Sequence, residues 1–100
     1  MEYAVKKTDN KVYIELKGDI DIVNASNFKN TCMEIIAEEK KDVVFDCSHL
    51  DFIDSTALGS MVIVNKYADS LGLNVKLVNA KERIKKLFSI TALDTVITIE

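Results

Sequence analysis

The sequence predicts an α/β domain built on a mostly parallel β-sheet. Three observations lead to this fold class. Segments with strand character alternate with segments of helical periodicity, the first two strands are separated by only a short polar turn, and one short apolar run rich in β-branched residues suits a central strand. Strands that alternate with helices join into a parallel sheet through right-handed crossovers, whereas a short turn joins antiparallel strands. The expected order is therefore β-β-α-β-α-β-α-β, with an antiparallel hairpin at one edge.

The N-terminal hairpin is predicted from two apolar segments around a polar turn. A weaker strand at Tyr3–Val5 precedes a stronger one at Val12–Lys17, and Thr8–Asn10 supplies the turn residues between them. The second strand is expected to end where the polar segment Gly18–Asp21 begins. We therefore expect that segment to form a loop.

A helix and then a buried strand are predicted next. Asn24 is a candidate N-cap, the helix is expected to end near Lys40, and apolar residues recur between them on one helical face. These residues are Phe28, Cys32, Ile35 and Ile36. The following run, Val43–Cys47, is short, apolar and β-branched, which predicts a central strand buried on both faces of the sheet.

The second half of the chain repeats the alternation. Ser48–Asp54 is expected to be a loop, and a broad apolar band predicts a helix from about Ser55 to Leu71, with Gly72 as its stop. The remaining elements are expected to be a strand, a helix and a closing strand or extended tail, at Asn74–Asn79, Glu82–Phe88 and Val96–Ile99.

Composition limits the classes of function. One hundred residues, 48% of them hydrophobic, suit a single domain over residues 1–100. The net charge of -3 argues against a nucleic-acid-binding surface. No apolar run approaches the ~20 residues that span a bilayer, and the first residues lack the order of a signal peptide. We therefore expect a cytoplasmic protein that binds neither nucleic acid nor membrane.

Neither a metal site nor a catalytic centre is expected. Cys32 and Cys47 lack the close Cys/His spacing of a structural zinc site, and we expect both to be reduced core residues. Ser55 as a nucleophile would need an adjacent base, yet the only histidine, His49, precedes it by six residues without a triad pattern. No glycine-rich phosphate loop is present. The basic residues Lys81, Arg83, Lys85 and Lys86 are interpreted as a solvated helix face.

The segment Leu50–Gly59 carries the most functional information, because a strand leads through it into a helix that opens with a hydroxyl residue. On local sequence alone, Ser55 is a first-turn residue and Asp54 a cap. In its order of motifs, however, nearly the whole chain resembles the anti-sigma-factor antagonist family, the STAS domains. Besides Leu50–Gly59, the matching segments are Gly18–Asp21, Val43–Asp46 and Leu87–Leu93.

The resemblance implies a phosphorylation switch. The partner would be a serine kinase that doubles as an anti-sigma factor and holds ATP-Mg itself, so that this chain needs no cofactor. Unphosphorylated, the chain would bind that kinase and release sigma factor; phosphorylated at Ser55, it would not, until a phosphatase removed the phosphate. Residues expected to contact the partner are Asp21, Asp54, Thr56, Ala57, Leu58 and Gly59.

Two alternatives remain open within this resemblance. The family most often has glycine where this chain has Ala57, which leaves a scaffold that assembles with partners without being phosphorylated as a second interpretation. Thr56 is a neighbouring hydroxyl that competes with Ser55 as phosphate acceptor. A monomer is the expected state of the free protein, since the surface that binds the kinase must stay free.

Overall fold

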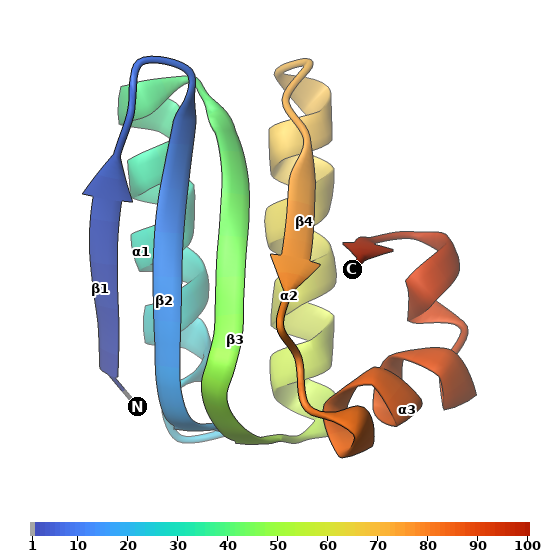
Figure 1. The fold of residues 1–100 in the computed structure, drawn as a ribbon. Coiled ribbons are helices and arrows are strands. Elements are labelled where there is room, and N and C mark those ends of the chain that lie inside the picture. Colours follow the sequence, from blue (N-terminus) through green and yellow to red (C-terminus); the bar gives the residue numbers. More distant parts are fainter. Residues whose placement is uncertain (1) are drawn as a thin grey trace.

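The computed structural model describes residues 2–100, and these form a five-stranded sheet in the order β1-β2-β3-β4-β5 (Figure 1). β1 is antiparallel to β2, while every other neighbouring pair is parallel. The predicted fold class, a mostly parallel sheet with an antiparallel hairpin at one edge, is thus confirmed. The strands are β1 (Glu2–Lys7), β2 (Lys11–Ile20), β3 (Asp42–Ile53), β4 (Val75–Val78) and β5 (Thr98–Ile99).

Helices connect the parallel strands. Figure 1 shows α1 and α2 behind the sheet, covering one face, and α3 beside the lower end of β4. The helix boundaries agree with expectation: Lys40 ends α1 in the left-handed conformation, and Gly72 follows α2 with a positive φ of 74°. The helices are α1 (Ala25–Glu39), α2 (Ser55–Ser70), α3 (Glu82–Ile90) and a short 3₁₀ turn, η1 (Leu93–Thr95).

The core lies between the sheet and the helices. Ile14, Phe45 and Leu77 stand side by side on β2, β3 and β4, and all three are fully buried. The ring of Phe28 on α1 packs 5.9 Å from that of Phe45. Both free cysteines are buried, as expected, and burial raises the pKa of the Cys47 thiol to about 12. Their packing is that of small apolar core residues.

Two boundary predictions are wrong in a related way. β2 runs on to Ile20 instead of ending before Gly18, and β3 runs on to Ile53 instead of entering a loop at Ser48. The two strands stay paired to the end, with Ile20 opposite Ile53, but their register shifts twice along the way. Because each β-bulge adds a residue to one strand, the buried residues no longer alternate strictly with exposed ones. Without that alternation, the polar side chains between the buried residues led to the prediction of loops at Gly18–Asp21 and Ser48–Asp54.

The prediction that Val43–Cys47 is a central strand buried on both faces is confirmed in part: β3 is the middle strand, and every residue of the run except Asp46 is buried. The two long helices cover a single face of the sheet (Figure 1). Asp46 and Ser48 are only partly buried and His49 is exposed. Val44 is only 3% exposed, and its register partners on the two adjacent strands, Tyr13 and Lys76, flank it. In residues 2–100, no helix is long and apolar enough to cross a membrane.

Candidate functional site

Asp54 fixes the start of α2 and so positions Ser55. It is the N-cap residue, with an extended backbone (φ -96°, ψ 178°), and its Oδ1 accepts a hydrogen bond from the N–H of Ala57 at 2.8 Å. This bond satisfies one of the N–H groups that every helix start leaves unpaired. Ser55 is the first residue of a helix of 16 residues, and its side chain is exposed. Its hydroxyl thus lies at the positive end of the helix dipole.

The second oxygen of the same carboxylate reaches another element. Oδ2 of Asp54 accepts a hydrogen bond from the N–H of Ile22 at 2.9 Å, and the N–H of Asp54 donates to the carbonyl of Ile20 at 3.2 Å. Asp54 therefore joins the loop between β2 and α1 to the first turn of α2. The predicted site residues Asp21 and Asp54 lie on these two connected segments.

The β2–α1 loop is held by its own hydrogen bonds. Asp21 accepts from the N–H of Val23 at 3.0 Å through Oδ1, and its carbonyl accepts from the N–H of Ala25 at 2.8 Å. Asn24 occupies the N-cap position as predicted, but its side chain makes no cap bond to α1. Its Oδ1 instead accepts from the N–H of Asp21 and its Nδ2 donates to the carbonyl of Asp19, each at 3.0 Å. The amide is used to hold the loop in one shape.

This loop exposes two large apolar side chains beside the start of α2. Ile22 is 71% exposed and Val23 is 89% exposed. An exposed apolar patch on a protein surface marks a candidate site for binding another protein. They were not among the predicted site residues. The signal in the sequence is two consecutive apolar residues inside a polar loop, between Asp21 and Asn24.

The other predicted site residues divide into an exposed and a buried set. Thr56 and Gly59 are exposed with Ser55, and apart from the backbone of α2 and the residues next to Gly59 no atom lies within 4 Å of where its Cβ would be. Ala57 and Leu58 are 0% and 4% exposed. The methyl group of Ala57 packs in the core, so it does not narrow the approach to Ser55. Both residues, backbone included, are almost fully enclosed, so Ser55, Thr56 and Gly59 form the exposed surface of this turn.

His49, the candidate base considered for Ser55, has its closest polar contacts on the sheet. Nδ1 of His49 lies 3.1 Å from Oγ of Ser48 and 3.8 Å from Oε1 of Glu15, both on the sheet. Two partners at one ring nitrogen differ from a catalytic triad, in which the nucleophile and the acid bind opposite nitrogens. Among residues 2–100, no group of three or more His, Cys, Asp or Glu side chains is arranged to hold a metal ion.

Comparison with known proteins agrees with this architecture. The family model of the STAS domain matches residues 2–100. The anti-sigma-B factor antagonist of Bacillus subtilis is 32% identical over 95 residues, which covers 95% of this chain and 86% of that protein. Protein TM1081 of Thermotoga maritima superimposes with a TM-score of 0.87 at 27% identity, over 97% of this chain and 84% of that one.

More distant structures share the fold. SpoIIAA, an anti-sigma factor antagonist, matches in its unphosphorylated form with a TM-score of 0.72 at 18% identity, over 95% of this chain and 97% of that one. The Bacillus SpoIIAA in its phosphorylated form gives 0.75 at 17% identity, over 99% and 91%. The family model matches all the described residues, and an anti-sigma-B factor antagonist is 32% identical over 95% of the chain. The chain therefore belongs to the anti-sigma-factor antagonist family of STAS domains.

Proposed function

We propose that this anti-sigma factor antagonist is a serine-phosphorylation switch. Unphosphorylated, it binds a serine kinase that acts as anti-sigma factor and thereby frees sigma factor. Phosphorylation of Ser55 by that kinase, with ATP-Mg held by the kinase, ends the binding, and a phosphatase restores it. The free chain acts as a cytoplasmic monomer. The observation that carries the proposal is the exposed hydroxyl of Ser55 at the first position of α2, next to the loop that Asp54 holds.

The geometry explains how a phosphate would be accepted without a change of fold. The first turn of a helix offers unpaired N–H groups and positive potential, which stabilise an anion. A phosphate adds about -1.5 to -2 charges at neutral pH. That charge would lie close to the carboxylate of Asp54, and Asp21 is on the adjoining loop. The resulting negative surface would repel an acidic partner surface, or impose a desolvation cost on an apolar one, that had docked on the neutral serine.

The buried position of Ala57 supports the switch over a scaffold that is never phosphorylated. Glycine at this position would remove a methyl group from the core, not from the surface around Ser55. On the exposed surface of α2, the residue without a side chain is Gly59, which lies one helical turn beyond Ser55. It allows the backbone of a partner to approach α2 closely.

Replacing Ser55 with aspartate tests the loss of binding. We expect Ser55→Asp to lower the affinity for the cognate kinase at least tenfold, which corresponds to about 1.4 kcal/mol, because a fixed negative charge then stands beside Asp54. The melting temperature should stay nearly unchanged, since an acidic residue suits the first turn of a helix. A pull-down with purified kinase and a thermal melt measure the two effects. Ser89→Asp, an exposed serine on α3, is the matched control for added charge.

Retention of wild-type affinity in Ser55→Asp would argue that Ser55 lies outside the interface. A collapse of the melting temperature would instead make Ser55 a residue that the fold requires.

The exposed pair Ile22 and Val23 is expected to anchor the same partner. The double variant Ile22→Ser, Val23→Ser should weaken kinase binding at least tenfold, because each anchor side chain that enters a partner's pocket contributes about 1 kcal/mol or more. Its stability should change little, since both side chains are already solvated. Titration calorimetry measures the affinity. Ile90→Ser is the matched control, since Ile90 on α3 is also 71% exposed. Equal losses in the control and the double variant would contradict a specific anchor.

A further inference from the structure

Within residues 2–100, the C-terminal half of β3 pairs with a strand on one side only. The last pair between β3 and β4 joins Asp46 to Val78, but β3 continues to Ile53. Beyond Asp46 it therefore has β2 as a neighbour on one side and no strand of residues 2–100 on the other. Backbone groups along such an open edge need other partners or solvent. This edge leads directly to Asp54 and Ser55.

Two cations from the start of α3 bind this edge at a single residue, Asp51. The guanidinium of Arg83 donates two hydrogen bonds to the carbonyl oxygen of Asp51, from Nε at 3.0 Å and from Nη2 at 2.8 Å. Nζ of Lys81 donates to the carboxylate of the same residue. Lys81, through this hydrogen bond, holds the pKa of Asp51 below its ordinary value, so the carboxylate is ionised at neutral pH. Two of the four basic residues predicted to form a solvated helix face, Lys81 and Arg83, thus bind Asp51.

Asp51 has no register partner on β2, whereas α3 bonds to it. On β2, Gly18 pairs with Leu50 and the next residue, Asp19, pairs with Phe52. Asp51 is the residue left over at this shift, as expected for a β-bulge. This unpaired residue, three positions before Asp54, is therefore bonded to Arg83 and Lys81.

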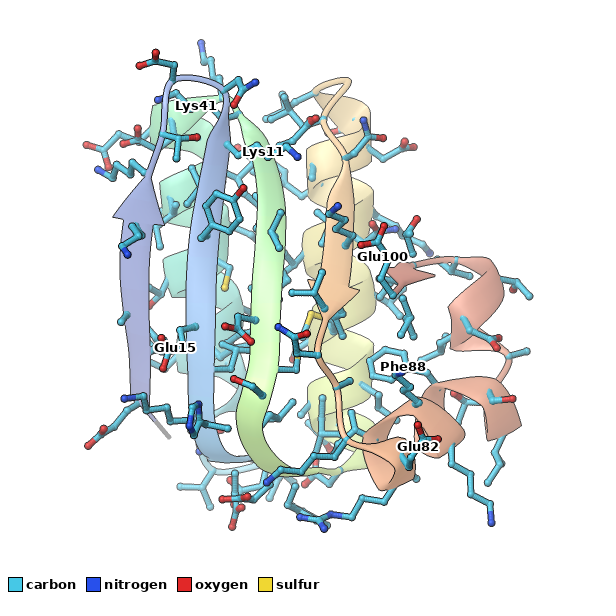
Figure 2. The ribbon with its side chains drawn as sticks, in the orientation of Figure 1. Lys11, Glu15, Lys41, Glu82, Phe88 and Glu100 are labelled. Atoms are coloured by element: carbon cyan, nitrogen blue, oxygen red, sulfur yellow. The ribbon has the colours of Figure 1, made fainter. Side chains whose placement is uncertain are left out.

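The helix that supplies these cations is itself anchored. Ile84 and Phe88 of α3 are buried, and Figure 2 shows the ring of Phe88 directed toward the sheet from α3. A guanidinium on an anchored helix that donates from two nitrogens to one carbonyl oxygen fixes direction as well as distance. A lysine in its place would supply charge without the fork.

We propose that Arg83, assisted by Lys81, is a positioning residue that holds the end of β3 so that Asp54 can present both Ser55 and the Ile22–Val23 loop to the kinase. This role rests on the proposed function, because it concerns the same interface. It adds α3 to the elements on which recognition depends, through Asp51 and without contact between α3 and the reacting hydroxyl. The effect is expected in the affinity for the kinase, not in the chemistry of phosphate transfer.

The test compares Arg83→Met and Arg83→Lys with Lys86→Met, which removes an exposed cation from the same helix. Hydrogen exchange monitored by NMR follows the amides of Ile22 and Ala57, which both donate to Asp54. In Arg83→Met, both should exchange about fivefold faster than in the wild type, the factor for loss of roughly one net hydrogen bond. Arg83→Lys should recover part of the protection, and Lys86→Met should match the wild type.

Phosphorylation kinetics give the functional readout with the same variants. Arg83→Met should raise the KM of the kinase for this chain about fivefold and leave kcat unchanged. Unchanged exchange at Ile22 and Ala57 would overturn the positioning role, whatever the kinase does. So would an equal effect in Lys86→Met, or equally faster exchange at the core amide of Phe45, which would indicate general destabilisation. If the exchange result holds but the wild type takes no phosphate on Ser55, it is the proposed switch that fails.

Discussion

Incubation with the cognate kinase and ATP-Mg is expected to add one phosphate per molecule, on Ser55, and none to the variant Ser55→Ala. Ser55 is exposed at the first position of α2, where the helix dipole and free N–H groups favour the product. Intact-mass spectrometry counts the phosphates, and peptide fragmentation locates them. The variant Thr56→Ala is the matched control, because it removes the adjacent exposed hydroxyl and should still be phosphorylated.

Two results would contradict this prediction in different ways. Phosphate on Thr56, lost in Thr56→Ala and kept in Ser55→Ala, would move the switch by one residue while keeping its logic. No phosphate on the wild type, with binding to the kinase intact, would favour the scaffold that assembles without modification. Ala57, where the family most often has glycine, is buried. A missing phosphate would therefore have to be explained by the kinase or by exposed residues around Ser55, and not by the alanine at position 57.

The order of elements was predictable because each has a clear period. The helical spacing of Phe28, Cys32 and Ile36 identified α1, and all three are buried in the structure. The ends of β2 and β3 were not predictable in the same way. Leu50 and Ile53 are both buried but lie three residues apart. In a regular strand, residues on the same face lie two apart. Only the pairing with β2, which is a long-range property, shows that the segment remains in the sheet.

The candidate site divides along the same line between local and distant interactions. Asp54 as the cap of α2 follows from a short sequence pattern, since the cap bond spans three residues. Its bond to Ile22 spans 32 residues, as do those of Arg83 to Asp51. Contacts of this kind depend on which loops the topology brings together at the carboxyl ends of the strands. A single sequence carries no periodic signal for them.

The double role of Asp54 leads to the second large effect. Asp54→Ala removes both the cap of α2 and the tether to Ile22, and we expect it to lower the free energy of unfolding by about 2 kcal/mol, roughly half from each bond. In a domain of this size, that loss should lower the melting temperature by about 10 °C. Chemical and thermal unfolding measure both quantities. Asp69→Ala, which removes an exposed carboxylate near the other end of the same helix, should be neutral or slightly stabilising.

Asp54→Asn separates the two roles, because an amide has only one oxygen. If that oxygen keeps the cap to Ala57, the amide nitrogen faces the N–H of Ile22, and two donors then meet where a hydrogen bond had been. The variant should therefore keep about half of the stability that Asp54→Ala loses, yet bind the kinase nearly as weakly, since the Ile22–Val23 loop is released in both. Stability and binding that fall in strict proportion across the two variants would show instead that Asp54 serves the fold alone.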